Sequence, residues 1–315
     1  MTYVLLLPGQ GSQKVGMGKD LYAAFPVARE AFQAVDDAVG APLSALAFDG
    51  PADELTRTVN AQPALLAHSA AVWAVVRPAI GAQVVAAAGH SLGEFSAYHV
   101  AGALDVAAAA RIVRRRGTLM YEQGMARPGA MAAVLGVLTT SIDDICAQAS
   151  AERGMVVPAN YNSDEQVVIS GEVAAVERAM ELAKDAGAKR CLPLPVSGAF
   201  HSPLMEPAVA GLADALAAET WQHPAIPVIA NVNAAAVTSA TEAVALLLQQ
   251  LTAPVQWTRV SRLLVAQYPE ATFVEIGSGA VLTGLLRRLA PSVKTMTCGT
   301  VAEVEKLLDS TGASA

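Results

Sequence analysis

The chain has 315 residues, of which 53% are hydrophobic, 16% charged and 5% aromatic, and its formal net charge is −7. This length suffices for one large domain, or for a large domain with a smaller insertion, and the composition supplies a substantial core. The negative charge and the few aromatic side chains argue against a nucleic-acid-binding protein, which needs a basic surface to neutralise phosphates and rings on which bases stack.

The sequence also gives no sign of a membrane span, a signal peptide or a metal site. No apolar run reaches the roughly 18 uninterrupted residues that a spanning helix requires. The opening segment 1–9 has no basic residues and breaks after a short apolar run. Three cysteines and five histidines show no paired ligand spacing. We therefore expect a cytoplasmic protein that binds neither membrane nor metal.

Apolar runs of strand length alternate with longer helical patterns along the chain. This alternation predicts an α/β protein with a mainly parallel sheet. In the first part of the chain, the expected elements are a strand at 3–7, a helix around 24–35, a helix at 62–80, a strand at 84–88 and a helix at 94–101. Further strands are expected near 228 and at 272–275, after the middle segment.

The middle of the chain follows a different order. The pattern predicts strands at 130–136, 155–159, 166–170 and 190–193, with helices at 140–152 and 172–186. The order β-α-β-β-α-β is that of a ferredoxin-like unit. We therefore expect a small subdomain over 126–196, inserted into a large α/β subdomain formed by 1–125 and 197–315.

The strongest chemical signal is Gly89-His90-Ser91-Leu92-Gly93, a GxSxG motif that follows an expected strand and opens an expected helix. In that setting the motif is typical of a nucleophile elbow, which presents the serine hydroxyl at a helix N-terminus. The N–H of Leu92, directly after Ser91, is placed to donate to an oxyanion. A chance match in a chain rich in glycine and alanine is the alternative.

A serine nucleophile needs a base, and His201 has the most site-like surroundings, in the loop Gly198-Ala199-Phe200-His201-Ser202. His90 is expected to point away from its neighbour Ser91, and His68 lies in a helical run rich in alanine and leucine. His99 and His223 have no supporting pattern. The residues alone leave the assignment of His201 as the base open.

The segment Pro8-Gly9-Gln10-Gly11-Ser12-Gln13 forms a glycine-rich loop after the first expected strand. It lacks the lysine of a P-loop and the GxGxxG spacing of a dinucleotide site. In a parallel sheet this loop lies at the carboxyl end of its strand, where ligands bind. The N–H of Gln10 is therefore a candidate second oxyanion donor, and a plain tight turn is the alternative.

Together these motifs resemble the malonyl-CoA:acyl-carrier-protein transacylases, a family that includes the acyltransferase domains of polyketide synthases. The resemblance is carried, in the family's order, by 8–13, Gly89 to Glu94, Arg116-Gly117, Gly198 to Ser202 and Pro254-Val255-Gln256-Trp257. It implies a hydrolase-like core with a ferredoxin-like insertion. It also implies transfer of a malonyl group from malonyl-CoA to the thiol of an acyl carrier protein, with coenzyme A thioester as substrate and no cofactor.

The resemblance assigns roles to individual residues. It implies a Ser91–His201 dyad without an acidic third member, in which the backbone carbonyl of Gln250 orients the imidazole. The N–H groups of Gln10 and Leu92 are implied as oxyanion donors. An acyl-serine intermediate and ping-pong kinetics follow from this arrangement.

The resemblance also implies how the acyl group is selected. Arg116 is matched to the acyl carboxylate, which a guanidinium binds bidentately; a solvated basic helix face with its neighbouring arginines is the alternative. Phe200 and Leu92 resemble the malonyl-selective pattern, since a bulky ring crowds an α-methyl branch. Asn160 and Asn162 resemble a segment that lines the pocket, although both are also typical turn residues.

Three other functions remain open. A GxSxG esterase or thioesterase shares the elbow but requires an acidic residue that orients its histidine, and Arg116 would have no role in such an enzyme. A noncatalytic coenzyme A or carrier-binding subunit predicts loss of Ser91, His201 or Arg116, yet all are present. Within the family, polyketide synthesis or malonate decarboxylase loading could replace fatty acid synthesis, which we expect. Monomer is the default expectation for the oligomeric state.

Overall fold

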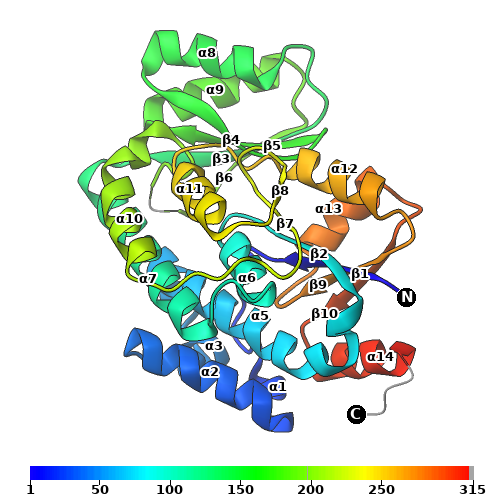
Figure 1. The fold of residues 1–315 in the computed structure, drawn as a ribbon. Coiled ribbons are helices and arrows are strands. Elements are labelled where there is room, and N and C mark those ends of the chain that lie inside the picture. The colour runs from blue at the N-terminus through cyan, green and yellow to red at the C-terminus, as the bar shows by residue number, and fades with distance from the viewer. Residues whose placement is uncertain (197, 312–315) are drawn as a thin grey trace.

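The larger of two sheets forms the centre of the protein (Figure 1). The computed structural model describes residues 1–196 and 198–311, and within them this sheet has the strand order β10-β9-β1-β2-β7-β8. Its strands are β1 Tyr3–Leu7, β2 Val84–Gly89, β7 Val228–Ile229, β8 Ala236–Val237, β9 Thr272–Ile276 and β10 Lys294–Cys298. Neighbouring strands are parallel except β7 and β8. The expected mainly parallel sheet is confirmed.

Helices cover both faces of this sheet because its strands are apolar on both sides. In β1, Leu5 and Leu7 pack into one core cluster, whereas Val4 and Leu6 pack into another, as the alternation of side chains along a strand requires. The first cluster draws on α2 Pro26–Val39, α5 Thr58–Ile80, α6 Leu92–Val100, α7 Val106–Ala126 and α14 Val301–Thr311. The second draws on α12 Trp257–Gln267 and α13 Val281–Leu289.

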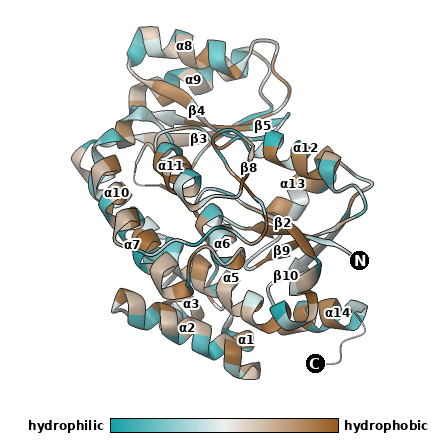
Figure 2. Cartoon of the chain, viewed as in Figure 1, coloured by the Kyte–Doolittle hydropathy of each residue, from teal (hydrophilic) through white to brown (hydrophobic). Residues whose placement is uncertain are grey.

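Shorter helices complete this part of the chain. They are α1 Lys19–Ala24, α3 Leu43–Asp49, α4 Ala52–Thr56, α10 Val209–Ala217 and α11 Ala240–Gln250, with 3-10 turns η1 Gly81–Gln83 and η2 Pro203–Ala208. Figure 2 shows hydrophilic and hydrophobic residues together on outer helices such as α8 and α14, whereas the central strand β2 is hydrophobic. That contrast is expected where amphipathic helices enclose a buried sheet.

Helix α5 runs through the core. The segment Thr58–Gln83 is long and apolar enough to cross a membrane by length and composition, but within its apolar 18-residue window, of mean hydropathy 1.3, 67% is buried inside the protein. A core helix passes the same test, because a helix that is apolar all round needs burial on all sides. Its contacts are with α2, α6, α7 and α14, so the protein itself supplies that burial.

A second, antiparallel sheet lies at one end of the molecule, at the top of Figure 1. Its strands are β3 Ala130–Leu135, β4 Val156–Ser163, β5 Gln166–Gly171 and β6 Arg190–Pro193, in the order β4-β5-β3-β6. Helices α8 Ile142–Arg153 and α9 Val173–Asp185 share a core cluster with one face of this sheet. Residues of the other face, such as Met131 and Val168, belong to the main core.

The edge strand β4 ties the two sheets together. Val255 N donates to Ala159 O at 2.8 Å and Tyr161 N donates to Val255 O at 2.9 Å, which adds a short parallel bridge between β4 and the loop before α12. We expected this strand to end at Ala159, because the polar segment that follows has no strand pattern. The strand continues to Ser163 with register shifts, since its backbone finds partners on both sides.

Most expected elements are confirmed with small changes of bounds. The strands at 3–7 and 190–193 have the expected limits, and the helices at 140–152 and 172–186 differ by one or two residues. The subdomain boundary that we expected at residue 197 and the chain end at 312–315 lie outside the described residues.

Candidate active site

Ser91 lies at a sharp turn between β2 and α6. Its backbone has φ 53° and ψ −107°, a left-handed conformation that is unusual for a residue with a side chain and that persists only where the surroundings enforce it. The flanking glycines allow the turn to close. A Cβ on Gly89 would overlap the backbone of Gly93, and one on Gly93 would overlap the backbone of Leu7 in β1. The GxSxG motif is therefore dictated by backbone packing.

Asn231, two residues after the end of β7, holds this turn through side-chain and backbone hydrogen bonds. Its Oδ1 accepts from Ser91 N at 2.7 Å and its Nδ2 donates to Gly89 O at 2.7 Å. The backbone N–H of Asn231 donates to Glu94 Oε2 at 3.1 Å. Asn231 is fully buried, so these bonds replace water at the groups that the turn leaves without helix or strand partners.

The hydroxyl of Ser91 meets the imidazole of His201. Ser91 Oγ lies 2.7 Å from His201 Nε2, and His201 Nδ1 lies 2.9 Å from the backbone O of Gln250. A carbonyl oxygen only accepts, so Nδ1 carries the proton and Nε2 is free to accept one. Burial, with a smaller contribution from Arg116, lowers the pKa of His201 to about 3. The imidazole is thus neutral, and its Nε2 lies within hydrogen-bond reach of the Ser91 hydroxyl proton, as a general base requires.

In the described part of the chain no carboxylate accepts a hydrogen bond from His201. Its Nδ1–H donates instead to the backbone carbonyl of Gln250, at the end of α11. His201 has a positive φ of 55°. The loop around it is held by Ser202, whose Oγ donates to Ala199 O at 2.6 Å and accepts from Leu204 N at 3.3 Å. Gln123 of α7 also donates from Nε2 to Leu204 O at 3.0 Å, so the loop that presents the imidazole is anchored on α7.

Arg116 approaches Ser91 from α7. Its Nη2 donates to Ser91 Oγ at 3.1 Å and to Gln250 Oε1 at 3.0 Å, and its Nη1 donates to Gln62 Oε1 at 2.7 Å. The side chain is only 1% exposed, and burial lowers its pKa to about 10, so it remains a cation at neutral pH. The solvated-face alternative is wrong for Arg116.

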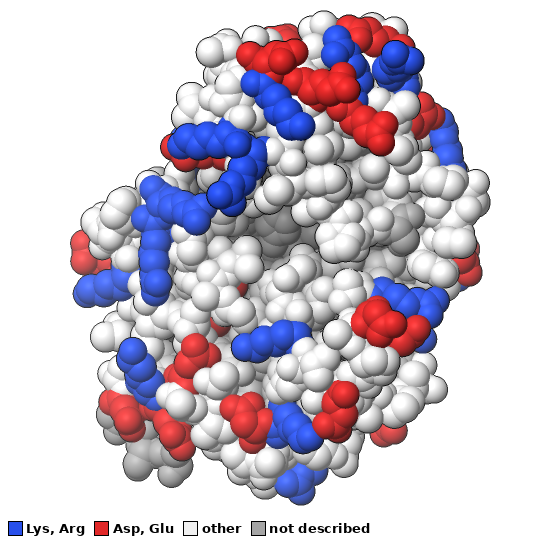
Figure 3. All heavy atoms as spheres, turned by 180° about the vertical axis from the view of Figure 1, so that it is seen from behind, with Lys and Arg blue, Asp and Glu red and all other residues white. Residues whose placement is uncertain are grey.

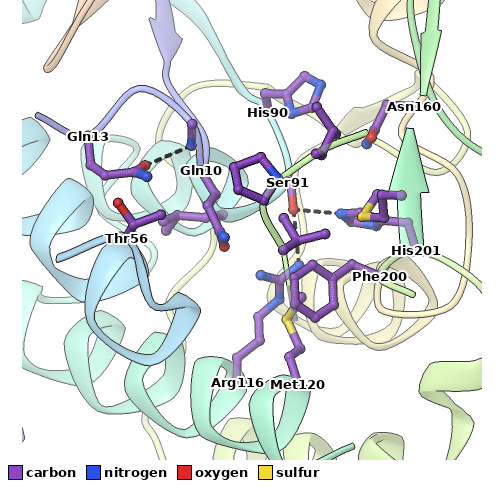
Figure 4. A pocket seen from close by; sticks show the side chains of 16 residues that line it. Gln10, Gln13, Thr56, His90, Ser91, Arg116, Met120, Asn160, Phe200 and His201 are labelled. Atoms are coloured by element: carbon purple, nitrogen blue, oxygen red, sulfur yellow. Dashed lines mark hydrogen bonds between the residues drawn. The ribbon is translucent and has the colours of Figure 1, made fainter. Parts of the chain in front are cut away.

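These groups line one cavity of about 210 Å³ (Figure 4). Figure 4 shows Ser91 at its centre, with His201 on one side, Arg116 from below and Gln10 from the opposite side. Leu92, Phe200 and Asn160 also line it. Gln250 does not; it is fully buried behind the cavity wall and contacts Arg116 and His201 from there.

One expected pocket residue is placed elsewhere. Asn162 is not among the lining residues of the cavity, and its Oδ1 lies 2.8 Å from His90 Nε2. A regular strand would place Asn160 and Asn162 on the same face, because residues two apart share a face. The register of β4 against β5 shifts between Tyr161 and Ser163, however, so the strand is irregular at Asn162. His90 lines the cavity wall, and burial lowers its pKa.

A site of this kind also needs donors for the negative charge that develops on the substrate oxygen, and two backbone N–H groups are candidates. Leu92 begins α6 and Gln10 lies in the loop after β1. Neither N–H makes a hydrogen bond to another described residue, and both residues line the cavity. The side chain of Gln10 is fixed separately, since its Oε1 accepts from Thr58 Oγ1 at 2.8 Å.

Sequence reasoning missed three buried polar residues behind the cavity: Gln62, Glu94 and Asn231. Glu94 appeared only as the last letter of the elbow motif, and burial raises its pKa to about 7. A polar residue inside an apolar run is the signal that could have found Gln62, within α5. Within the described residues, no group of three His, Cys, Asp or Glu side chains is placed to hold a metal ion.

The fold and the site define a class of α/β proteins with a serine on a strand-to-helix elbow, and the comparisons identify its family. The model of the acyl transferase domain matches residues 2–306. The malonyl CoA-acyl carrier protein transacylase of Escherichia coli (strain K12) is 44% identical over 301 residues, 96% of each chain. Its namesake in Bacillus subtilis (strain 168) is 44% identical over 291 residues, 92% of this chain and 91% of that one.

Solved structures agree. The acyl-carrier-protein S-malonyltransferase of Bartonella henselae is 43% identical, with a TM-score of 0.93 over 99% of this chain and all of that one. A malonyl-transacylase solved in complex with its type II PKS acyl-carrier protein is 40% identical, with a TM-score of 0.93 over 98% of this chain and all of that one. The chain belongs to the acyl transferase family.

Proposed function

We propose that this protein transfers a malonyl group from malonyl-CoA to the phosphopantetheine thiol of an acyl carrier protein through an acyl-serine intermediate. The observation that carries the proposal is the meeting of Ser91, a neutral imidazole and a buried guanidinium in one cavity. The named relatives act on the same two partners. Among pathways, fatty acid synthesis is our proposal, with polyketide synthesis or malonate decarboxylase loading as alternatives.

The first half-reaction loads Ser91. His201 Nε2 takes the hydroxyl proton as Ser91 Oγ attacks the thioester carbonyl, and the N–H groups of Gln10 and Leu92 donate to the oxyanion. The carbon–sulfur bond breaks, and His201 returns the proton to the sulfur of coenzyme A. The Gln250 carbonyl holds Nδ1–H throughout, which supports the proposed roles of Gln250 and His201.

The second half-reaction reverses the first with a different thiol. The carrier's thiol loses its proton to His201 and attacks the malonyl ester, and the proton returns to Ser91 Oγ as the ester bond breaks. Arg116 holds the malonyl carboxylate in both steps. An acetyl group has no carboxylate to pair with this buried cation, so the acyl class is selected by charge.

Phe200 and Leu92 are proposed to limit the acyl group at its α-carbon. Both line the cavity and are buried, and a branched acyl chain needs room beside them. One methyl group is typically worth only about 1–3 kcal/mol, so selection against methylmalonyl is partial. Asn160, 6% exposed in the same wall, is proposed as a polar contact of the acyl group.

A thioesterase is the second function that the elbow allows, and two observations disfavour it. No acidic side chain orients His201 in the described residues, and Arg116 faces Ser91 Oγ. A simple thioesterase needs the first and has no use for the second. We therefore expect hydrolysis of malonyl-CoA to be slow compared with transfer to a carrier thiol.

The domain organisation and the state of the protein in the cell are further parts of the proposal. We infer that residues 126–196 form a ferredoxin-like subdomain, supported by the order β4-β5-β3-β6 and by two helices that share one core with it. Residues 1–125 and 197–315 are proposed as the hydrolase-like large subdomain. We also propose a cytoplasmic monomer without a cofactor, with no nucleic-acid or membrane partner.

The surface supports a carrier as partner despite the net charge. Figure 3 shows the reverse face, hollowed near its middle, with uncharged residues around the hollow and Lys and Arg side chains gathered along one flank. An acidic partner would be steered by such a flank, although the chain as a whole carries a formal charge of −7.

The deciding experiment is intact-mass spectrometry after brief incubation with malonyl-CoA. We expect a malonyl-sized adduct on the wild type, no adduct on Ser91→Ala, and little adduct with acetyl-CoA. Addition of a carrier protein should then remove the adduct and place it on the carrier. An unmodified protein would support a binding subunit, and steady loss of malonyl-CoA without a carrier would support a thioesterase.

A further inference from the structure

Two opposite charges are buried beside Ser91 without touching each other. Arg116 on α7 and Glu94 on α6 are each only 1% exposed. Neither belongs to an ion pair within the described part of the chain. The side-chain amide of Gln250 lies between them: Oε1 accepts from Arg116 Nη2 at 3.0 Å, and Nε2 donates to Glu94 Oε2 at 2.7 Å.

This spacing leaves the guanidinium available. A carboxylate in direct contact would occupy two donors of Arg116 at once. Instead Nη2 reaches Ser91 Oγ, and Nε has no partner among the described residues. A buried cation without any counter-charge would be strongly destabilising. Glu94 offsets the charge of Arg116 across the side-chain amide of Gln250, because the Coulomb attraction between two charges persists over that distance in a buried site.

The carboxylate of Glu94 is held through one of its two oxygens. Glu94 Oε2 accepts from Asn231 N at 3.1 Å as well as from Gln250, whereas Oε1 has no partner in the described residues. Gln250 Nε2 also donates to the backbone O of Ser91 at 3.0 Å. The amide therefore has one orientation, with its oxygen toward Arg116 and its nitrogen toward Glu94.

We propose that Glu94 is the remote counter-ion of Arg116 and that it sets the strength with which the site holds an acyl carboxylate. The inference rests on the proposed malonyl transfer and deepens it. The acyl carboxylate and Glu94 compete for one positive charge, so Glu94 weakens the hold on the malonyl group. That matters for a transferase, because a group bound too tightly in the acyl-enzyme would be slow to leave.

Glu94→Gln separates charge from hydrogen bonding. The new amide oxygen can still accept from Gln250 and Asn231, but the negative charge is gone. At pH 8, where Glu94 of the wild type is mostly ionised, we expect the ratio of malonyl to acetyl single-turnover acylation, measured by intact mass, to rise about tenfold in the variant, which corresponds to one pKa unit of charge interaction. The rise should come from a lower half-saturating concentration of malonyl-CoA.

Glu275→Gln is the matched control. Glu275 is also fully buried, but it accepts from the backbone of Leu282 and Thr283 at the start of α13, away from Arg116 and Gln250. It should lower the melting temperature without moving the ratio. An unchanged or lower ratio in folded Glu94→Gln, or an equal rise in Glu275→Gln, overturns the proposal. A wild type that malonyl-CoA does not acylate overturns the proposed function instead.

A measurement on the wild type alone keeps the proposal testable if Glu94→Gln does not fold. The charged and titratable groups that face Glu94 are Arg116 from α7 and Tyr98 on its own helix, with His201 beyond Gln250. Burial raises the pKa of Glu94 to about 7, whereas Arg116 stays charged and His201 neutral near that pH. The malonyl-to-acetyl ratio should therefore rise from pH 8 to pH 6; a constant ratio contradicts the proposal.

Discussion

His201 illustrates how burial prepares a side chain for proton transfer. Water is excluded and a cation, Arg116, lies nearby, so the pKa of the imidazole is lowered to about 3. The neutral ring accepts a proton from Ser91 only while the transition state needs it, because the resulting imidazolium lies near another positive charge. The proton is therefore passed on readily to a leaving sulfur, and the same ring serves both half-reactions.

Removal of Arg116 should change which acyl group is transferred. In Arg116→Ala the malonyl carboxylate would enter a buried site without a partner, and loss of one partner of a buried ion pair amounts to about 3–5 kcal/mol. We expect kcat/KM for malonyl-CoA to fall by two orders of magnitude or more, and acetyl transfer to gain relative to it. Steady-state rates with both thioesters test this; an unchanged preference would mean that another residue selects the acyl group.

The elbow between β2 and α6 depends on close backbone contacts. Gly93 lies against Leu7 of β1, and His90 N donates to Leu7 O at 3.0 Å, so the first turn of α6 is packed directly on the sheet. Ser91 is held in its strained conformation by this packing and by Asn231. Local strain at a reactive residue is thus stabilised by the whole element pair.

Gly93→Ala tests that packing. The added methyl group has no space beside the backbone of Leu7 and Pro8, so either the helix or the strand must move. We expect the free energy of unfolding to fall by about 2–3 kcal/mol or more, and acylation of Ser91 to be largely lost. Urea denaturation and intact mass measure the two effects. Gly284→Ala, where the added methyl group would enter open space beside α13, is the control and should retain both.

The sequence predicts the elbow at Ser91 well, but it does not predict the distant residues that hold the site in place. Gly89 to Gly93 could be interpreted because motif, strand and helix are contiguous in the chain. Asn231 contacts Ser91, which lies 140 residues away in the sequence, and Gln62 contacts Arg116, which lies 54 residues away. Nothing in the local sequence of Asn231 or Gln62 encodes those partners. The misplaced Asn162 has the same origin, since the course of β4 is decided by its bonds to Val255.

Across the whole molecule, burial of ionisable groups links stability to pH. Burial lowers the pKa of four histidines, His68, His90, His99 and His201, and raises that of two carboxyl groups, Glu94 and Glu275. His68 and His201, with pKa values of about 4 and about 3, stay neutral in the folded protein between pH 5 and pH 6 but titrate near 6.5 when unfolded. Below that pH the unfolded chain binds their protons first, which destabilises the fold on acidification. The two carboxyl groups act in the opposite direction, because the folded form retains their protons.

Since the histidines outnumber the carboxyl groups, acidification should destabilise the protein. The unfolded chain gains protons at His68 and His201, and it releases the proton that the folded chain keeps at Glu94. With about one more proton bound by the unfolded chain from these three groups, the free energy of unfolding should fall by about 1–1.5 kcal/mol per pH unit between pH 6 and pH 5. Urea denaturation at pH 7.5, 6 and 5 measures this.

His68→Gln is the diagnostic variant. His68 has a pKa of about 4, its Nε2 lies 2.9 Å from Gly299 O, and it is not among the residues that line the catalytic cavity. Its replacement should make the pH dependence shallower by about one proton while acylation of Ser91 continues. Stability that is constant or rises from pH 6 to pH 5 would show that the buried carboxyl groups dominate instead, because only they release protons when the chain unfolds in that range.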